Sequence, residues 1–574
     1  MTTYREAAHT NSYEFTAGAG YQLPEYPFVE PPELHSPNPV RHPVVIVGGG
    51  ISGLTLACSL ARLGVRAVLI DEDNTVGVKG ASSRGICYTQ KSLEIFERLG
   101  LYERIAAKGV QWSVGRTFAG VDEVYSFDLR QQGQYHLSQQ PPFINIQQFY
   151  IEGFLVERIQ EIGAVDLRWQ NRLTAFEQNA DFATLTIETP AGSYQLEAEH
   201  VIDATGSHSP LRKWLNVPFD SKRGDDRWCI ADVRFTTHPP QERHTWIEAP
   251  FNENRAVWQH LMADDVWRID YQMAPNADPA YVSREDVVRE RLARQFGPDV
   301  DVEIVWVGPY AYRSECVHAM RHGRVYLMGD SAKVVSPFGA RGGNTGVADA
   351  DNLAWKLAAV LSGKADAALL ESYNDERLDA AQQNVCVTNR TARFLRAADG
   401  TERVFRQAAI GLAKQHPFAR SLINTGRMAV ANPYARSRAC SHETSSAAGQ
   451  SVQNVGFEWA DGSTGDVNDL LNWAHGDLLV LVFGDLPAAD AQRLRRLCMD
   501  APVRGVQVLG ANGVAQALEH VRDAKGHVQG ACQVSANGWA LVRPDGYLAA
   551  TGETINAQLV RAIERSLGLR GDQP

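Results

Sequence analysis

A glycine-rich turn near the start of the chain has the spacing of a loop that binds phosphate. Gly48-Gly49-Gly50-Ile51-Ser52-Gly53 fits the pattern GxGxxG, follows the apolar run Val44–Val47 and opens a helical stretch, Leu54–Leu63. Glycines here allow a tight turn and close approach of a pyrophosphate, and the helix N-terminus adds free N–H groups and a positive dipole end. Asp71 follows the next apolar run, where its carboxylate can bind the hydroxyls of a ribose. The pattern favours a dinucleotide site over a turn that serves packing alone.

A second glycine-rich segment lies near residue 330. The apolar run Val325–Met328 ends in Gly329-Asp330, and the stretch Ser336–Val347 reads SPFGARGGNTGV before a long helical stretch. Such a loop can bring backbone N–H groups against an electron-rich heteroaromatic edge. The helix dipole there favours an anion, as on the N1–C2=O side of reduced flavin. Two tight turns without a ligand are the alternative.

Strands and helices must hold these loops in place, and the sequence predicts them. The first loop lies in a β-α-β unit of about thirty residues, the spacing that a parallel sheet needs. A proline-rich arm at 1–42, with interleaved aromatic residues, is expected to lie extended against the body. Between 225 and 308, alternating runs such as Ala256–Leu261 and Val266–Gln272 predict an antiparallel sheet with two distinguishable faces.

A separate α/β pattern follows a small, polar stretch at 438–454 that has the composition of a linker. The expected elements of this last unit are strands at Leu478–Phe483 and Val506–Leu509, helices at Ala489–Leu497, Val514–Val521 and Ile555–Leu567, and a hairpin around Pro544-Asp545-Gly546.

Composition and charge exclude several classes of protein. The chain has 574 residues, 44% hydrophobic and 21% charged, which is ordinary for a folded protein with several domains. A net charge of −11 opposes binding to nucleic acid or to an anionic membrane surface. No apolar run approaches the ~18 residues of a membrane span, and no secretory signal is expected. The 8 cysteines form no CxxC and no metal-binding signature such as HExxH occurs, so we expect reduced thiols, no metal and a cytoplasmic location.

The order of the motifs resembles that of a known family. The Gly48–Gly53 turn, Ser83-Arg84, Gln148 with Glu152, and Gly329-Asp330 with the block PFGARGGNTGVADADNLAWKL occur in the order seen in FAD-dependent aromatic hydroxylases. These are class A flavin monooxygenases of the p-hydroxybenzoate and phenol hydroxylase type. The resemblance covers about 43–430 and is nearest to the 3-(3-hydroxyphenyl)propionate hydroxylase-like branch. The segment 455–570 resembles the thioredoxin-like tail of phenol hydroxylase relatives.

The resemblance implies an α/β fold with three parts. A Rossmann-like FAD-binding domain with a helical extension would occupy 43–224 and 309–437, and an inserted antiparallel β-sheet substrate domain would occupy 225–308. After the linker at 438–454, a C-terminal thioredoxin-like α/β domain without redox cysteines would occupy 455–574. Because the linker separates two independently patterned units, deletion of the last domain is expected to leave FAD binding intact.

The resemblance also assigns roles to individual residues. Asp71 would bind the adenosine ribose, Asp330 the ribityl chain, and Pro337 would lie beside the reactive carbon of the flavin. The other implied cofactor contacts are Gly48, Gly50, Ser52 and Gly53 at the pyrophosphate, Glu72 beside the ribose, Arg84 and Gln148 at the ribityl-pyrophosphate region, and Gly342, Gly343 and Asn344 at the pyrimidine edge. Taken alone, Arg84 is equally well a surface charge and Gln148 a loop amide.

Substrate is expected at the antiparallel sheet. Alternation groups Gln259 and Asp270 with Leu261, Arg268 and Gln272, and sets them apart from Trp258, His260, Trp267, Ile269 and Tyr271. The family's arrangement implies that the first group faces the flavin, so Gln259 and Asp270 are the catalytic candidates beside Pro337. The sequence itself leaves open which face packs. His260 and the tryptophans are expected in the core, because large aromatic residues fill sheet interfaces.

Two residues depart from the family's pattern. Thr205 stands where an aspartate usually precedes Gly206, in a pair that the family uses for flavin and nicotinamide contacts. Lys333 stands where a histidine is common, and a lysine is a point charge that cannot act as a neutral imidazole. Both departures put in question whether this chain binds and oxidises a nicotinamide nucleotide in the way that the family does.

The implied function is that of a FAD- and NAD(P)H-dependent monooxygenase. It would use O₂ to hydroxylate a phenolic or related aromatic substrate through a flavin C4a-hydroperoxide, with noncovalently bound FAD. The single GxGxxG fits an enzyme that meets NAD(P)H transiently. A flavin oxidase or dehydrogenase on the same scaffold and a FAD-binding assembly protein without turnover stay as alternatives. A homodimer is the oligomeric state that we expect if the protein self-associates.

Overall fold

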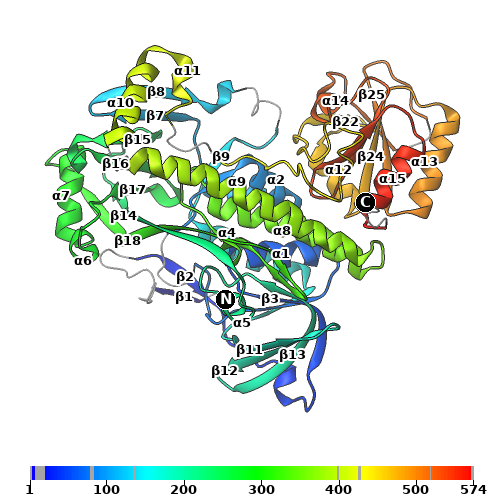
Figure 1. Cartoon of the computed structure of the whole chain (residues 1–574), viewed down its shortest axis with the longest axis horizontal. Coiled ribbons are helices and arrows are strands. Elements are labelled where there is room, and N and C mark those ends of the chain that lie inside the picture. The colour runs from blue at the N-terminus through cyan, green and yellow to red at the C-terminus, as the bar shows by residue number, and fades with distance from the viewer. Residues whose placement is uncertain are drawn as a thin grey trace.

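The computed structural model describes residues 20–77, 83–132, 138–396, 400–423, 428–516 and 519–569, with the backbone alone for the strand at 3–6 and for 223–226. The described strands form two eight-stranded sheets, a seven-stranded sheet and two small ones. Figure 1 shows the second eight-stranded sheet and the seven-stranded sheet on opposite sides of two long helices, α8 (Arg341–Leu361) and α9 (Glu371–Arg396).

The first sheet contains a parallel core. Five of its strands, given below as β10, β4, β3, β13 and β20, pair in parallel, and the runs Val44–Val47, Ala67–Ile70 and Val325–Leu327 within them are apolar and buried. The strands of this sheet in spatial order are β10 (Val165–Arg168), β4 (Ala67–Ile70), β3 (Val40–Val47), β13 (Gly192–Asp203), β12 (Ala183–Thr189) and β11 (Arg172–Gln178), with β20 (Val325–Leu327) and β19 (Arg321–His322) beside β13.

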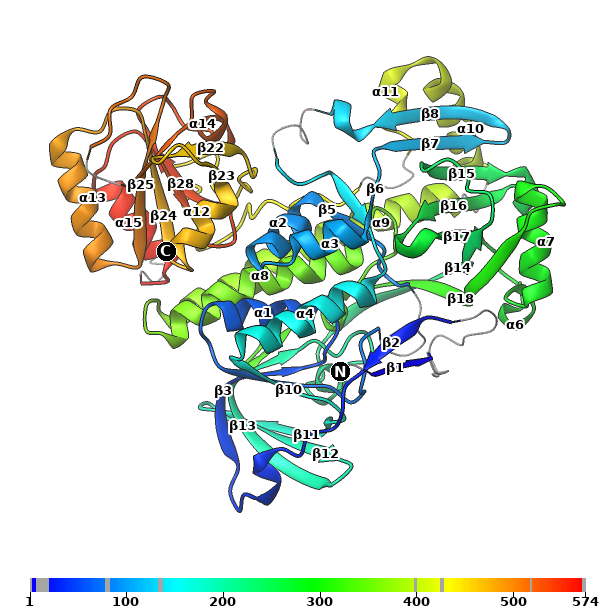
Figure 2. The same cartoon turned by 180° about the vertical axis from the view of Figure 1, so that it is seen from behind.

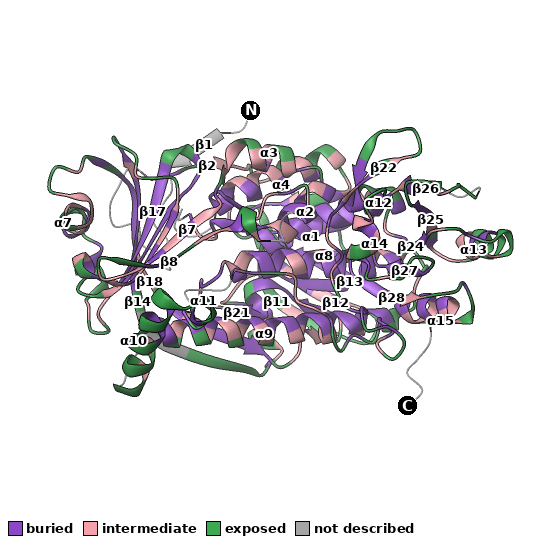
Figure 3. Ribbon diagram, turned by 90° about the horizontal axis from the view of Figure 1, so that it is seen from above, coloured by how far each residue is buried: buried purple, intermediate pink, exposed green. Residues whose placement is uncertain are grey.

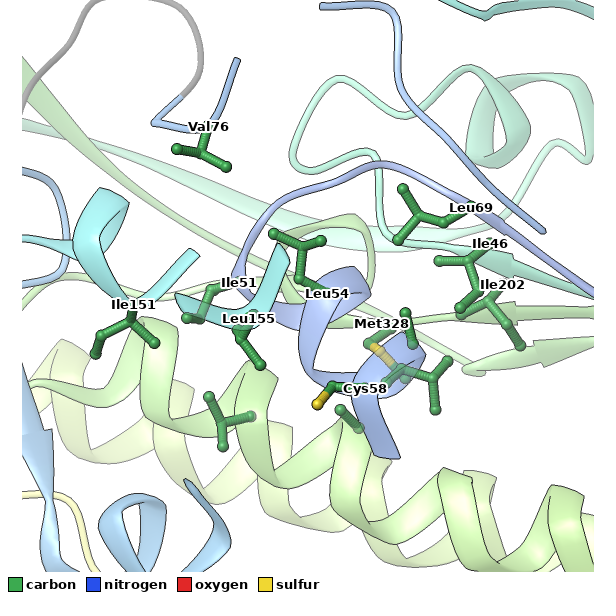
Figure 4. Packing of buried hydrophobic residues seen from close by; sticks show 14 of the residues in the cluster. Ile46, Ile51, Leu54, Cys58, Leu69, Val76, Ile151, Leu155, Ile202 and Met328 are labelled. Atoms are coloured by element: carbon green, nitrogen blue, oxygen red, sulfur yellow. The ribbon is translucent and has the colours of Figure 1, made fainter. Parts of the chain in front are cut away.

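The predicted β-α-β unit is confirmed as β3, α1 (Ile51–Arg62) and β4. Both α1 and α8 begin earlier than the apolar patterns indicated, because their first turns consist of the glycine-rich residues themselves. Helix α1 packs against α8 and α4 (Gln148–Ile162) (Figure 2). Figure 4 shows how side chains of these helices interlock with strand residues such as Ile46 and Ile202.

The second sheet is larger than the expected 225–308. It reaches from residue 219 to residue 317, and the hairpin at 114–128 extends it because the first strand of that hairpin pairs in parallel with residues 243–248. Its strands in spatial order are β21 (Lys333–Val334), β18 (Val302–Val317), β14 (Phe219–Phe235), β17 (Val266–Gln272), β16 (Arg255–Leu261), β15 (Arg243–Ala249), β7 (Val114–Ala119) and β8 (Asp122–Asp128). Helix α7 (Glu285–Phe296) covers one face.

The seven-stranded sheet is the centre of the C-terminal unit. Strands β24 and β25 match the sequence patterns, but the predicted helix Val514–Val521 is wrong: residues 514–516 are not helical and 519–522 form β26, paired in parallel with β25. In spatial order the strands are β23 (Thr464–Asp466), β22 (Gly456–Trp459), β26 (Glu519–Arg522), β25 (Val503–Leu509), β24 (Leu478–Phe483), β27 (Trp539–Val542) and β28 (Leu548–Gly552). Its helices are α12 (Val467–Ala474), α13 (Ala488–Asp500), α14 (His527–Ala531) and α15 (Ala557–Ser566).

The remaining elements connect these sheets. A small sheet joins β5 (Cys87–Thr89), β9 (Phe143–Asn145) and β6 (Val110–Gln111), and β1 (Thr3–Glu6) pairs with β2 (Gln22–Glu25). The other helices are α2 (Gln90–Arg98), α3 (Tyr102–Lys108), α5 (Pro210–Trp214), α6 (Pro279–Val282), α10 (Gly400–Gln415) and α11 (Pro417–Arg420). Figure 3 shows the central helices α1 and α8 mostly buried and α10 at the periphery mostly exposed. In the described parts of the chain, no helix has the length and apolarity needed to cross a membrane.

Two connecting segments lie against the body. In the described part of the arm, Tyr21 and Leu23 are buried and Tyr26 stacks on Trp169 with ring centroids 4.5 Å apart, as the interleaved aromatic residues predicted. The stretch 438–454 has no helix or strand, as its composition indicated. It is nevertheless bound to the C-terminal unit: Ser441 N–H donates to the carbonyl of Ala549 at 2.8 Å.

Candidate cofactor and substrate site

Several candidate residues follow neighbouring parallel strands of the first sheet. Gly48 follows β3, Asp71 follows β4, and Gly329 comes two residues after β20. Since these strands are parallel, their carboxyl ends meet at one edge of the sheet, which is where ligands bind in open α/β sheets. The topology therefore gathers two loops that lie about 280 residues apart in the sequence.

The three motif glycines of the first loop serve different purposes. Gly48 has φ +110°, and a Cβ there would collide with the carbonyl of Ala204, while a Cβ at Gly53 would overlap the carbonyl oxygen of Gly48. These two glycines are required by the packing of α1 against β3 and β13. A Cβ at Gly50 would meet nothing nearer than Glu152 Oε1 at 4.0 Å, so this glycine leaves open space at the N-terminus of α1.

Asp71 is fixed beneath the first loop. Its carboxylate accepts the backbone N–H of Gly49 at 2.5 Å and that of Asp73 at 2.8 Å. Burial raises the pKa of Asp71 to about 7, although both N–H groups oppose the shift. Glu72 is exposed beside it. Asp71 therefore shapes the loop as well as lying at the predicted ribose position.

Gln148 and Glu152 form a buried pair on α4. Gln148 Nε2 donates to Glu152 Oε1 at 2.7 Å, and Gln148 Oε1 accepts the N–H of Gly85 at 3.2 Å. Glu152 Oε2 accepts the N–H of Gly77 at 2.9 Å. Burial raises the pKa of Glu152, and the positive charge of Arg84 opposes this rise. The amide of Gln148 thus holds Gly85, and the carboxylate of Glu152 holds Gly77.

The second loop presents an acidic side chain. Asp330 is exposed, and among the described residues its carboxylate has no hydrogen-bond partner. Desolvation by the surrounding protein raises the pKa of Asp330, and the positive charges of Arg84 and Lys333 oppose the rise. The hydroxyl of Ser52 packs against Gly329 and Gly346, because a Cβ added to either glycine would overlap it.

The N-terminus of α8 is bare on the side of its glycines. A Cβ at Gly342 or Gly343 would meet nothing nearer than 3.9 Å, so the backbone of this turn is accessible to a ligand. The side chain of Asn344 is not: its Oδ1 accepts the N–H of Thr89 at 2.9 Å and its Nδ2 donates to the carbonyl of Cys87 at 2.8 Å. The predicted contact of Asn344 with the pyrimidine edge can therefore involve its backbone alone.

The two departures from the family pattern have partners inside the protein. Lys333 is buried and forms an ion pair with Asp349, whose other oxygen accepts Arg377 Nε at 2.7 Å. The hydroxyl of Thr205 donates to Asp203 Oδ1 at 2.6 Å. Both side chains therefore stabilise the turns after β20 and β13.

The second sheet corrects the prediction for Gln259. Antiparallel pairing sets Trp258 opposite Asp270 and Gln259 opposite Ile269, so Gln259 and Asp270 lie on opposite faces. Gln259 accepts from Gln295 Nε2 of α7 at 3.1 Å, on the face away from the glycine loops. Asp270 lies on the opposite face, together with Arg268 and Trp258. Arg268 Nη1 donates to the carbonyl of Arg84 at 2.6 Å, so this side of the sheet, which we call the inner face, is turned toward the segment that holds Arg84. Alternation groups residues within a strand, but only the register relates one strand to the next.

The inner face carries an aromatic cluster. Trp258 contacts Phe338 with ring centroids 4.8 Å apart and stacks on Trp228 at 5.0 Å, and Tyr312 lies 5.7 Å from Phe338. The indole N–H groups of Trp228 and Trp258 are buried without a hydrogen-bond partner in the described residues. Pro337, adjacent to Phe338, is half-buried, so the sheet meets the second glycine loop at this cluster.

Sequence reasoning missed a polar link between the arm and this face. Tyr21 donates its hydroxyl to Asp232 Oδ2 at 2.7 Å, and burial raises the pKa of Asp232 to about 6. Asp232 stands inside the mostly apolar run Trp228–Val233, and an acid in such a run is the signal that the sequence offered.

Comparison with known proteins agrees with this geometry. A family model described as FAD binding domain matches residues 41–388, which is more than half of the chain. The chain belongs to the FAD binding domain family. This confirms the resemblance drawn from the motifs.

Curated relatives of this FAD binding domain chain carry hydroxylase names. It is 27% identical over 358 residues to the 3-(3-hydroxy-phenyl)propionate/3-hydroxycinnamic acid hydroxylase of Klebsiella pneumoniae, covering 62% of each chain. It is 30% identical over 349 residues to the 12-dehydrotetracycline 5-monooxygenase/anhydrotetracycline 6-monooxygenase of Streptomyces rimosus, covering 59% of this chain and 67% of that protein. The chain thus matches less than two thirds of the length of the first of these relatives.

Solved structures share the fold over nearly the whole chain. The flavin-dependent monooxygenase PieE in complex with FAD and substrate superposes with a TM-score of 0.78 at 24% identity, covering 93% of this chain and all of that one. Aklavinone-11 hydroxylase with FAD and aklavinone gives a TM-score of 0.72 at 22% identity, covering 92% of this chain.

The residues present fit FAD. The open space at Gly50, the bare first turn of α8 and the unpartnered carboxylate of Asp330 lie at one edge of the sheet. A helix N-terminus suits a pyrophosphate, and a carboxylate suits a polyol. These donors and acceptors are the ones that a flavin dinucleotide requires.

Proposed function

We propose that this chain is a FAD-dependent monooxygenase that hydroxylates a phenolic or related aromatic substrate with O₂ and NAD(P)H. The observation that carries the proposal is twofold: two glycine loops, each at a helix N-terminus, lie at one edge of the first sheet, and the second loop meets an aromatic face of the second sheet at Phe338. The names of the curated relatives, which are monooxygenases and hydroxylases, support the same reaction class.

Each part of the site has a task in this proposal. Bound FAD would supply electron transfer from NAD(P)H and activation of O₂. The N-terminus of α1 with Gly50 would hold the pyrophosphate, and Asp330 would accept hydrogen bonds from the ribityl chain. The N-terminal dipole of α8 would stabilise negative charge at the pyrimidine edge of the ring. The aromatic cluster would hold the substrate ring and exclude water.

The same proposal extends to the arrangement of the parts. We assign the first sheet with α1, α4 and α8 to a Rossmann-like FAD-binding domain and the second sheet to substrate binding. The seven-stranded sheet, with four α-helices in its described residues, would be a thioredoxin-like domain. It would have no redox role, because none of its cysteines forms a CxxC pair.

A panel of phenolic acids and neutral phenols tests the proposal. Purified protein with FAD is mixed with each compound and with NADH or NADPH, and nucleotide oxidation, hydrogen peroxide and product mass are measured. A hydroxylated product formed in step with nucleotide oxidation is expected for at least one compound. Substrate dehydrogenation with peroxide as the sole oxygen product would identify an oxidase instead. Absence of any nucleotide oxidation would favour a FAD-binding protein without turnover.

A further inference from the structure

The carboxylate of Asp349, on α8, is shared by three donors at the start of the second glycine loop. Its Oδ2 accepts the backbone N–H of Gly329 at 3.0 Å and also the ammonium of Lys333. Its Oδ1 accepts Nε of Arg377, from α9, at 2.7 Å. The three charged side chains are at most 2% exposed. The loop is therefore held by a buried charge cluster, which we call the Asp349 cluster (Lys333, Asp349 and Arg377).

The Asp349 cluster has two cations and one carboxylate. Within the described residues, Lys333 and Arg377 each form an ion pair with Asp349 and with no other acid. The remaining contacts of Arg377 are with neutral groups, the carbonyl of Thr345 and the hydroxyl of Tyr434, both at 3.4 Å. Breaking a buried ion pair is costly because it leaves one charge alone. Asp349 would still have Arg377 if Lys333 lost its charge, so the lysine is not required to neutralise this acid.

Lys333 lies between the two positions of the loop that we assign to the flavin. It comes three residues after Asp330, the expected ribityl contact, and four before Pro337, the expected neighbour of the reactive carbon. The charge of Lys333 acts on the carboxyl of Asp330 and opposes the rise in the pKa of that group. The ammonium is therefore close enough to the loop for its charge to be felt there.

The other charges around the loop have partners besides Lys333. The carboxyl of Asp330 is acted on by Arg84 more strongly than by Lys333, and by Arg313 as well. The nearby acid Glu315 forms ion pairs with Arg212 and Arg313. Removal of the charge of Lys333 would therefore lower the positive potential at the loop without leaving an acid unpaired.

Reduction of a flavin changes its charge. At neutral pH the oxidised ring takes up two electrons and one proton, so the reduced ring keeps one negative charge, on its N1–C2=O side. A fixed positive charge in a buried site stabilises this anion more than the neutral oxidised ring. A neutral imidazole from the histidine that is common at this position would not add such a charge.

We propose that the buried ammonium of Lys333 favours the reduced state of bound FAD and so raises the reduction potential of the cofactor. The inference goes beyond the proposed function, because it concerns the cofactor and holds whatever the substrate is. It assigns to Lys333 the tuning of the flavin, in addition to its contact with the turn after β20.

The reduction potential of the bound FAD tests this assignment. The FAD-containing protein is reduced slowly without O₂ beside a dye of known potential, and the absorbance of both is followed. Lys333→Met has a neutral side chain of similar length. It should lower the midpoint potential by about 30 mV or more, which is a tenfold loss of preference for reduced over oxidised FAD. Lys333→Gln should show the same fall, and Lys333→Arg, which keeps the charge, should retain most of the parental potential.

Lys356 provides a matched control on α8. It is buried, and its partner Glu376 also accepts Arg543, so this site too has a second cation for the carboxylate. Lys356 comes seven residues after Asp349, about 10 Å farther along the helix and away from the loop. Lys356→Met should therefore lower the melting temperature about as much as Lys333→Met but shift the potential far less.

An unchanged potential in Lys333→Met and Lys333→Gln overturns the assignment, and so does an equal shift in Lys356→Met. If neither neutral variant of Lys333 gives a folded protein, the claim that Arg377 suffices for Asp349 is wrong and the assignment fails with it. The measurement needs no substrate, nucleotide or O₂. The expected shift without any hydroxylated product would contradict the proposed function alone, and hydroxylation with an unchanged potential would contradict the role of Lys333 alone.

Discussion

Asp330 is the residue on which the second half of the cofactor site depends. Its carboxylate has no hydrogen-bond partner in the described residues, so a bound ribityl chain would provide the missing donors. Asp330→Ala removes the acceptor and leaves a ligand hydroxyl unpaired, at a cost of about 1–3 kcal/mol. FAD affinity measured by titration of the apoprotein should fall by about five- to two-hundred-fold. Asp181→Ala, in an exposed turn, should leave the affinity unchanged, and an Asp330→Ala protein with parental affinity would show that the second loop is only a turn.

Asp71 gives the apoprotein a specific pH dependence. Its pKa rises from 3.8 to about 7 on folding, so between these values the folded state holds a proton that the unfolded state has lost. Its contribution to stability is complete below pH ~4 and is lost as the pH rises through about 7, at most about 4 kcal/mol. Chemical unfolding of apoprotein from pH 5 to pH 8 should show Asp71→Asn losing less stability than the parent. Equal losses would mean that Asp71 is ionised throughout.

At the scale of elements, the two glycines that flank the first turn of α1 should behave differently. Gly50→Ala places a methyl group in open space, so the melting temperature of the apoprotein should hardly change while FAD affinity falls about tenfold or more. Gly53→Ala forces the turn apart because its methyl group overlaps the carbonyl of Gly48, and should destabilise the apoprotein by about 1–3 kcal/mol. If Gly50→Ala binds FAD normally, the pyrophosphate does not lie at this turn.

What the sequence predicts well at this scale is local. Glycine spacing, apolar runs and a following acid are all contained in one short stretch, so the first loop and its β-α-β unit were predictable. The error for Gln259 arose because alternation says nothing of the register between strands. The helix expected at Val514–Val521 is in part β26 because pairing with β25 and β22 outweighs local preference.

At the scale of the whole molecule, the C-terminal unit is joined to the FAD-binding body by buried ion pairs. Arg543, in the hairpin between β27 and β28, donates to Glu376 of α9 at 2.6 Å and to Asp545 at 2.6 Å, and Glu376 also accepts Lys356 of α8 at 2.7 Å. All four side chains are at most 1% exposed. The stretch at 438–454 thus joins two units that share a charged interface, which the sequence could not reveal because the partners are distant in the chain.

This interface changes the expectation for the isolated body. Deletion of 455–574 would leave Glu376 and Lys356 without Arg543 and should lower the stability of the remainder together with its FAD content. In the full chain, Arg543→Ala should cost about 3–5 kcal/mol because it leaves buried carboxylates uncompensated. Arg565→Ala, which breaks an exposed pair with Glu443, should cost less than about 1 kcal/mol. Denaturant unfolding measures both, and a truncated body as stable as the full chain would show that the units are independent.

The fate of molecular oxygen tests the central claim most directly. The protein with FAD, a nicotinamide nucleotide and an aromatic acid that stimulates nucleotide oxidation is supplied with oxygen gas of the heavy isotope, and the product is examined by mass spectrometry. A monooxygenase places one heavy oxygen atom on the ring for each nucleotide oxidised and releases the other as water. We expect that result, and its loss in Asp330→Ala when FAD is limiting. A product without heavy oxygen, or heavy oxygen found only in hydrogen peroxide, would contradict the account.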